Sequence, residues 1–397
     1  MHLSASLLDL NFVLLLCIVG MLRALWPRSH YALFVALSSA LVVGLASLPT
    51  LLAISGITLL YLYPVHRVMH AVRLSKRLNR FSRFLLPLSV CGLVAVLVVF
   101  KLYKHFTIPW FGGPRIQANV LALVGFSYFL FRAIGFLHIQ SILKMDERTP
   151  WTLLGFSLFP PTLTSGPIQK FQDFQQQVSD PEPLSRALIL SAAYRITRGY
   201  FRKLVLAALL NTWAEKLLGI HHPSIYVSVL SISVLYLFFY FDFAGYSDIA
   251  IGFGLLLGIR VPENFRKPFL ATTVSEFWRN WHITLADWFR DQVFIPFGGM
   301  RASRVWAASL AFLIMFLCGL WHGLTLSFLL WGCWHGLVLF TEALSGAKPV
   351  PPPARQGPEY WLRVLWTNAR VAFGAVFFLP FDSTLRLLGG FTRWLPL

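Results

Sequence analysis

Long apolar runs constrain this chain more than any other feature. The runs at Phe12–Trp26, Phe84–Phe100 and Ser309–Trp334 approach or exceed the roughly 20 apolar residues that a helix needs to cross a bilayer. Only helices and closed barrels satisfy their own backbone groups in lipid, and these runs lack the alternation of barrel strands. We therefore expect an all-α polytopic membrane protein with about 9–11 transmembrane helices plus re-entrant segments.

The charge pattern favours a membrane location over nucleic-acid binding. Charged residues make up 13% of the chain, against about a quarter in soluble proteins, and the formal net charge is +18. Cytoplasmic loops of membrane proteins collect Lys and Arg, which accounts for the excess without nucleic acid. The densest basic cluster consists of Arg67, Arg73, Lys76, Arg77, Arg80 and Arg83. It favours a cytoplasmic loop facing membrane lipids, with docking of an acidic carrier protein as the alternative.

The chain reads as a single integral-membrane domain over residues 1–397. A Pro-rich stretch at 345–360 cannot form a spanning helix and is expected to be an exposed connector. The first apolar run lacks a basic start and a cleavage site, so we expect it to remain as the first helix, with the N-terminus outside. The four cysteines lie in apolar runs without metal-type spacing, so neither a disulfide framework nor a metal site is expected.

A polar segment at 259–302 interrupts the apolar chain. It is either a solvated loop or an irregular segment folded into the protein at membrane depth, which is tolerated only around a cavity. Trp278, Trp281 and Trp288 alternate with its charges. Because indole rings prefer an interface or a protein-lined pocket, they weaken the loop interpretation.

Three of the eleven histidines are candidates for proton transfer, to which imidazole is suited near neutral pH. His282 lies in the polar segment, whereas His322 and His335 lie inside apolar runs, where an ionisable side chain is costly and is by default a functional candidate. The structural alternative for each is a histidine hydrogen-bonded within the bundle. On one helix, His322 and His335 would be about 220° and roughly 20 Å apart, so they share a site only if Gly323 breaks the helix.

Motifs of other enzyme classes are missing from the sequence. It contains no serine elbow, no persuasive Ser-His-Asp order and no HExxH motif. The glycines of Gly252–Gly258 follow no βαβ pattern, so they indicate helix packing and not nucleotide binding.

The polar segment carries a family resemblance. "FWRNWHITLADWFRDQVFIPFGG", followed by "GLWHG", resembles the signature of the bacterial membrane-bound O-acyltransferase family. "FDFAGYSDIAIGFGLLLGIRVPENFRKPF" and "FPPTLTSGPI" are similar to two upstream segments of that family, so the resemblance covers about 124–340. It implies a bundle of helices around a central funnel, with an acyl donor entering from the cytoplasmic side and a hydroxyl acceptor from the other.

The resemblance also assigns site residues. His322 matches the family's near-invariant histidine and would take the hydroxyl proton, while His282 would orient the acceptor or the donor carbonyl, or stabilise the oxyanion. The weaker substrate-binding candidates are Arg279, Asn280, Trp281 and Trp321. No cofactor and no metal are expected, because the activated acyl donor supplies the energy.

The resemblance leaves the acyl group open. "SYFLFRAIGFLHIQ" and "PTLTSGPI" slightly favour the D-alanyl export proteins, whose donor is a D-alanyl carrier protein, whereas "IPFGGMR" resembles the polysaccharide O-acetylation proteins, which use an acetyl donor. The acceptor would be an extracytoplasmic polymer or partner transferase, and the location the bacterial cytoplasmic membrane. The alternatives of another class are a lipid or polymer transporter and a non-catalytic scaffold.

Overall fold

The computed structural model describes residues 10–74, 79–105, 125–139, 149–301, 303–351 and 357–392. Within these ranges every regular element is a helix, and one isolated antiparallel bridge joins Phe265 and Trp281. Lys76 and Arg77 of the basic cluster, and 352–356 of the Pro-rich connector, lie outside them. The described chain forms two compact units, unit 1 with Met1–Arg198 and Tyr246–Pro262, and unit 2 with Gly199–Gly245 and Glu263–Leu397.

Several helices have the length and apolar composition needed to cross a membrane. In the described ranges, five such helices lie at Arg28–Ala46, Leu48–Ala71, Ile225–Leu256, Arg304–His322 and Leu326–Ser345. Shorter apolar helices lie at Phe12–Leu25, Leu86–Val99 and Phe126–Ile139. The expected all-α polytopic membrane fold is therefore confirmed, while the count of about 9–11 crossings stays a prediction.

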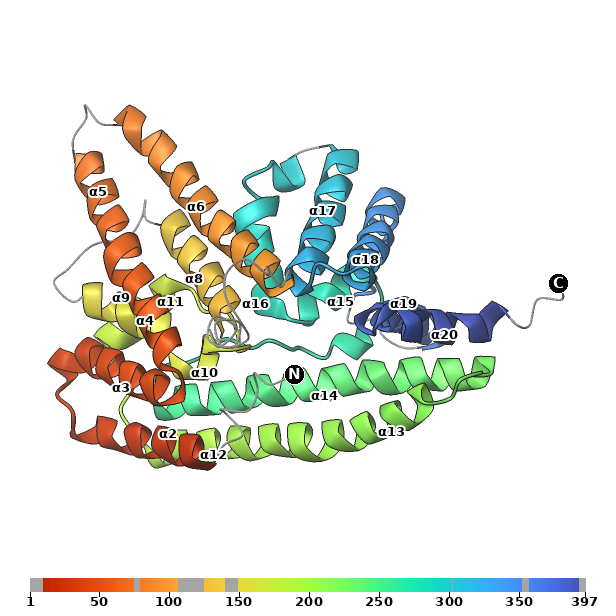
Figure 1. Ribbon diagram of the computed structural model, residues 1–397, viewed down its shortest axis with the longest axis horizontal. Helices are drawn as coiled ribbons and strands as arrows, with labels where there is room; N and C mark the ends of the chain where they lie inside the picture. The colour runs from red at the N-terminus through yellow and green to blue at the C-terminus, as the bar shows by residue number, and fades with distance from the viewer. Residues whose placement is uncertain are drawn as a thin grey trace. The chain divides into compact units, whose positions relative to one another are not determined.

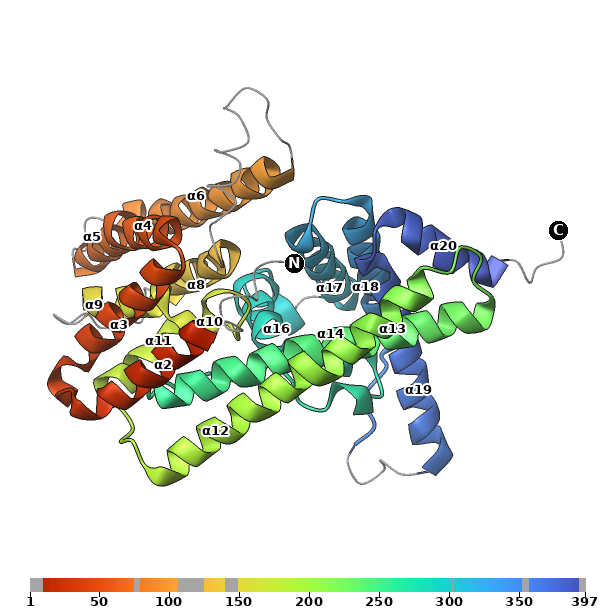
Figure 2. The ribbon, with the colours of Figure 1, turned by 60° about the horizontal axis from the view of Figure 1, so that its bottom comes forward.

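Unit 1 is built mainly from the N-terminal helices. Its elements are α2 (Leu10–Leu22), η1 (Arg23–Leu25), η2 (Arg28–His30), α3 (Tyr31–Ala46), α4 (Leu48–Ile57), η3 (Thr58–Leu62), α5 (Tyr63–Leu74), α6 (Asn79–His105), α8 (Phe126–Ile139), α9 (Thr149–Leu158), α10 (Pro160–Leu163), α11 (Phe171–Ser179) and most of α12 (Arg186–Tyr200). Helix α3 packs against α9 (Figure 1; Figure 2), where a Cβ on Gly155 would lie 3.2 Å from Val35. A larger side chain would force these two helices apart.

A buried arginine holds α8, α9 and α10 together in unit 1. The guanidinium of Arg132 donates to the carbonyl oxygens of Phe156 at 2.7 Å and Ser157 at 2.8 Å, and to the Thr162 hydroxyl at 3.2 Å. These carbonyls belong to the last turn of α9, which has no intrahelical donors for them. Arg132, in the segment "FRAIGFLH", therefore caps the C-terminal end of α9 and joins it to the following segment "FPPTLT".

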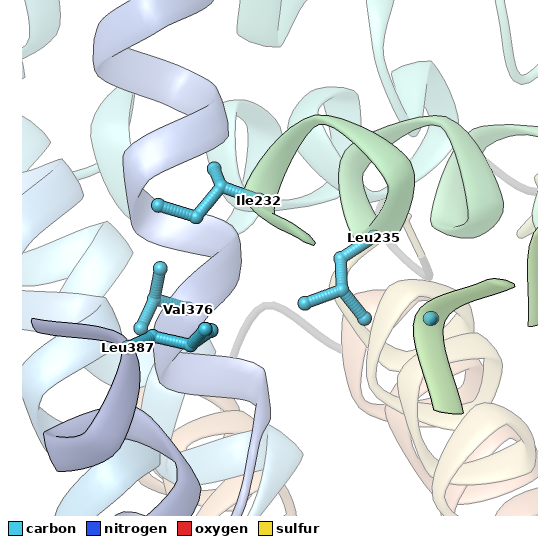
Figure 3. Close-up of a cluster of buried hydrophobic side chains, with 5 residues drawn as sticks. Ile232, Leu235, Val376 and Leu387 are labelled. Atoms are coloured by element: carbon cyan, nitrogen blue, oxygen red, sulfur yellow. The ribbon is translucent and has the colours of Figure 1, made fainter. Parts of the chain in front are cut away.

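Unit 2 contains the polar segment from Glu263 onward and the C-terminal helices. Its elements are η6 (Phe201–Ala207), α13 (Ala208–Leu218), most of α14 (Ile225–Leu256), η7 (Pro268–Leu270), α15 (Val274–Asn280), α16 (Ile283–Phe289), η8 (Arg290–Phe294), η9 (Gly299–Arg301), α17 (Arg304–His322), α18 (Leu326–Ser345), α19 (Gly357–Gly374), η11 (Ala375–Phe378) and α20 (Phe381–Thr392). Figure 3 shows an apolar cluster in which Ile232 and Leu235 of α14 face Val376 of η11 and Leu387 of α20. This cluster ties α14 to the C-terminal helices.

Helices α17 and α18 form a tight hairpin in unit 2 (Figure 1). A Cβ on Gly319 would lie 2.5 Å from the carbonyl oxygen of Phe328, and one on Gly332 would lie 2.9 Å from that of Met315. Close backbone approach at small residues is a common way to pack helices in membranes. Gly323 ends α17, and the Thr325 hydroxyl accepts from the N–H of Phe328 at the start of α18.

Candidate active site

The polar segment is folded onto helix α18. At the start of α15, the carboxylate of Glu342 accepts from the N–H groups of Val274 at 2.9 Å and Ser275 at 2.7 Å. The Thr273 hydroxyl accepts from a third N–H, that of Glu276. Because Thr273, Val274 and Glu342 are buried and these contacts satisfy free N–H groups of the helix, this part of the segment is not a solvated loop. Its depth in a membrane stays a prediction.

Backbone pairing holds His282 in an unusual conformation. The N–H of Arg266 donates to the carbonyl of Asn280, and the N–H of Ile283 donates to the carbonyl of Asn264, both at 3.0 Å. Between these bonds His282 has φ 48° and ψ 51°, in the left-handed region that non-glycine residues rarely occupy. Such conformations persist where the surrounding structure enforces them, and they cluster at functional sites.

The imidazole of His282 is buried and has one anchored nitrogen. Its Nδ1 lies 3.2 Å from Oδ1 of Asn264, and the ring of Phe243 packs edge-on with centroids 4.6 Å apart. Nε2 is buried without a hydrogen-bond partner among the described residues. Burial, and secondarily the charge of His322, lowers the pKa of His282 to about 3, so the ring is neutral at pH 7. A buried nitrogen without a partner is uncommon in a native interior, which makes Nε2 a candidate contact for a substrate.

Aromatic side chains surround the polar segment on one side. Tyr236 and Tyr240 of α14 both pack against Trp281, with ring centroids 6.3 and 6.0 Å from the indole. Trp281 also stacks on Phe277 at 5.4 Å and meets Phe265 edge-on at 5.1 Å. Trp281 is therefore part of the rigid wall that fixes the position of the neighbouring histidine.

His322 lies at the end of α17 and is held by rings. Its centroid lies 4.7 Å from Trp321, 5.3 Å from Trp331, 4.9 Å from Phe378 and 5.8 Å from Phe328. A positive charge on His322 would lower the pKa of His282, so the two predicted histidines, separated by 40 positions in the sequence, lie within electrostatic reach of each other.

His335 shares this aromatic environment. Trp331 packs against His322 at 5.3 Å and against His335 at 4.8 Å, while Trp278 of α15 meets His335 at 5.0 Å. The sequence allowed His322 and His335 to share a site only if Gly323 breaks the helix. Gly323 does end α17, and the hairpin brings both histidines to the indole of Trp331. His335 is 1% exposed and lies against the backbone of Gly374, where a Cβ would meet its ring at 2.2 Å.

The weaker candidates on α15 are tied to their own helix. Nε of Arg279 donates to the carbonyl of Ser275 at 3.2 Å, and Nδ2 of Asn280 donates to the carbonyl of Glu276 at 2.8 Å. Arg279 is exposed, and Asn280 is half-buried. Trp321 packs on His322 itself.

Sequence reasoning missed the residues that position the histidines. Asn264 and Phe243 contact His282, and Phe378 contacts His322. The fragment "PENF" offered a signal, because an amide between apolar residues next to a polar segment needs a hydrogen-bond partner.

Comparison with known proteins identifies the family. Residues 144–348, slightly more than half of the chain, match the sequence model of the membrane-bound O-acyltransferase family. The chain belongs to the membrane-bound O-acyltransferase family. The matched region contains both His282 and His322.

Relatives within this family carry two different names. A probable alginate O-acetylase of Pseudomonas syringae pv. tomato is 34% identical over 222 residues, covering 55% of this chain and 42% of that protein. A teichoic acid D-alanyltransferase of Bacillus subtilis is 29% identical over 255 residues, covering 61% of this chain and 64% of that protein. One of Streptococcus thermophilus is 34% identical over 245 residues, covering 58% of each chain. The chain therefore spans about half the length of the alginate relatives it matches.

Proposed function

We propose that this membrane protein is an O-acyltransferase that moves an activated acyl group from a cytoplasmic donor to a hydroxyl acceptor outside the membrane. The observation that carries the proposal is the buried, neutral imidazole of His282, whose Nε2 has no hydrogen-bond partner among the described residues, in the electrostatic vicinity of His322. Acyl transfer to a hydroxyl needs a proton acceptor and a polar group that orients the substrate, and two neighbouring imidazoles meet that need. Both histidines lie within the region that matches the family.

The chemical step uses His322 as the base. The acceptor oxygen attacks the acyl carbonyl carbon while the hydroxyl proton passes to His322, giving a tetrahedral intermediate. The intermediate collapses as the bond to the donor breaks, and the proton on His322 passes to the departing donor group. His282 orients a substrate, and Arg279, Asn280, Trp281 and Trp321 supply weaker substrate contacts. The aromatic rings pack around the half-buried His322 and would reduce the access of water to the activated acyl group, which limits its hydrolysis.

Two acyl groups are compatible with this site. A D-alanyl group is slightly favoured by the segments around Phe131 and Thr162, and its donor would be a D-alanyl carrier protein. An acetyl group is supported by the probable alginate O-acetylases, whose name states that activity. The acceptor is a polymer of the bacterial cell envelope or a partner transferase. The protein is a single integral-membrane domain that lies in the bacterial cytoplasmic membrane and contacts its lipids.

The first experiment measures ester-linked acids on the cell envelope. A strain lacking this protein is complemented with the wild type, with His322→Ala or with His221→Ala, an exposed histidine at the turn before α14. Mild alkali releases esters for mass spectrometry. We expect D-alanine or acetate to be lost in the deletion strain and to return with the wild type and His221→Ala only.

Each outcome of this experiment has a defined meaning. Loss of D-alanine identifies a D-alanyl transferase, and loss of acetate identifies an acetyl transferase. Unchanged esters in the deletion strain, or full restoration by a membrane-inserted His322→Ala protein, would contradict the proposed function and favour a transporter or a scaffold.

A further inference from the structure

Asn264 lies behind His282 and presents a carbonyl oxygen to it. Asn264 is fully buried, and its Oδ1 is 3.3 Å from the N–H of Thr284 and 2.9 Å from the Thr284 hydroxyl. A backbone N–H can only donate, so the side-chain atom that faces it must be the oxygen and not the NH₂ group of the amide. The orientation of the Asn264 amide is therefore determined by the backbone of α16.

The oriented amide determines which nitrogen of His282 carries the proton. Nδ1 lies 3.2 Å from the same Oδ1. Because this oxygen can only accept, Nδ1 must donate and must carry the hydrogen. A neutral imidazole has a single N–H, so Nε2 holds a lone pair. Nε2 is the nitrogen that is buried without a hydrogen-bond partner among the described residues.

The surroundings keep the ring in this neutral form. Phe243 of α14 faces it with a ring edge, and Asn264 and Thr284 contribute uncharged polar groups. His322 is the titratable group that acts on it, and its charge opposes a second positive charge on His282. A ring that resists protonation is a poor proton acceptor but a good hydrogen-bond acceptor. This division of labour leaves proton transfer to His322.

We propose that Asn264 is a positioning residue that holds His282 in its Nδ1–H form, so that Nε2 accepts a hydrogen bond from an O–H or N–H group of the substrate. That group is one other than the reacting hydroxyl, whose proton passes to His322. The inference rests on the proposed function and narrows it. A lone pair repels an oxyanion, so His282 orients a substrate and does not stabilise the tetrahedral intermediate.

The tautomer can be measured without any assay of acyl transfer. Protein labelled with ¹⁵N in its histidine rings is compared with the His282→Asn variant, which assigns the His282 signals by their loss. We expect wild-type His282 to show protonated Nδ1 and unprotonated Nε2 at pH 7. We expect the Asn264→Leu variant to show both tautomers or the opposite one. A wild-type ring with protonated Nε2 would overturn the inference even if acyl transfer is intact.

Turnover at varied pH tests the role of the tautomer. The Asn264→Asp side chain accepts the same hydrogen bonds but adds a negative charge that favours a protonated His282. We expect its kcat/KM to approach the wild-type value at alkaline pH and to fall at a pH at least about one unit above the acid limb of the wild type. Asn264→Leu should lower kcat/KM by about 10- to 100-fold at every pH.

A half-buried, hydrogen-bonded asparagine in unit 2 serves as the control. Asn368 accepts from the Tyr236 hydroxyl at 2.9 Å and donates to the carbonyl of Phe269 at 2.9 Å. Asn368→Asp should lower the thermal midpoint but leave the position of the acid limb unchanged. An Asn264→Asp protein whose acid limb coincides with that of the wild type would refute a positioning role. If Asn264→Leu does not fold, the pH dependence of Asn264→Asp and the ¹⁵N spectrum of the wild-type histidine rings still test the positioning role. Absence of transfer in the wild type, with the expected tautomer present, would refute the proposed function alone.

Discussion

The two histidines of the site are held by different kinds of contact. His282 is fixed by a hydrogen bond to Asn264 and by a left-handed backbone between two paired segments. His322 lies at the end of the regular helix α17, within a set of aromatic rings. A polar anchor fixes the direction and protonation of a ring, whereas ring packing fixes its position and excludes water. The difference fits the proposed function, in which one imidazole orients a substrate and the other exchanges protons.

The largest effect should come from His322→Gln. This change removes the proton acceptor but keeps a polar side chain of similar size on α17. We expect kcat to fall by about 10²- to 10⁴-fold. The thermal midpoint should change little, because the surrounding rings can pack against the new side chain. Turnover of an activated acyl donor by purified protein measures the first quantity, and a thermal scan measures the second. Wild-type turnover by a folded variant would remove His322 from the mechanism.

The polar anchor of α15 should be the most sensitive point for stability. Glu342→Ala leaves the buried N–H of Val274 and the part-buried N–H of Ser275 without their acceptor. We expect a loss of about 2–3 kcal/mol in the free energy of unfolding, because unsatisfied buried donors are costly. Thr341→Ala is the adjacent control, since Thr341 is exposed and bonds only within α18. Equal denaturation midpoints for the two variants would show that Glu342 does not anchor the segment.

The backbone conformation should make position 282 more sensitive to a β-branched residue than position 322, with a smaller effect on stability than the loss of Glu342. Asn tolerates the left-handed region, but a β-branched residue does not. The free energy of unfolding of His282→Val should therefore be about 1–2 kcal/mol lower than that of His282→Asn. At position 322, in an ordinary helix, the Val and Asn variants should differ by only a few tenths of a kcal/mol. Denaturant titration of the four variants gives this comparison, and equal differences at both positions would contradict it.

The pH dependence of stability should identify His282. Its pKa is lowered from 6.5 to about 3 in the folded protein, so the unfolded chain binds the extra proton first. The contribution to stability is present above the unfolded pKa of 6.5 and is lost as pH falls through about 3. His282→Asn should flatten this part of the curve, whereas an exposed His221→Ala variant should follow the wild type. Parallel curves for wild type and His282→Asn would rule out a buried, neutral ring.

The smallest effect should come from Arg279→Ala. The side chain is exposed and bonded within its own helix. If it adds a weak substrate contact, KM should rise by about two- to threefold with kcat unchanged. The matched control is Arg363→Ala on α19, whose partner is Glu359 four residues earlier. A large fall in kcat for Arg279→Ala would show that this arginine acts in the chemical step.

The sequence predicted the elements and the candidate residues better than it predicted their connections. Apolar length identified the spans, the polar segment pointed to His282, and an ionisable side chain in an apolar run pointed to His322, since all three signals are local. The role of Asn264 depends on pairing between residues 18 positions apart, which no local pattern encodes. The contact of His322 and His335 through Trp331 depended on whether Gly323 ends α17, and the sequence left that condition open.

The left-handed backbone at His282 also restricts which amino acids can replace this residue during evolution. Most amino acids are penalised at that φ whether or not they support catalysis, so glycine, asparagine and aspartate are the least costly replacements. Invariance at position 282 among homologues would combine a geometric demand with a chemical one. The helical position of His322 imposes no such geometric demand, so invariance there would report selection on chemistry more directly.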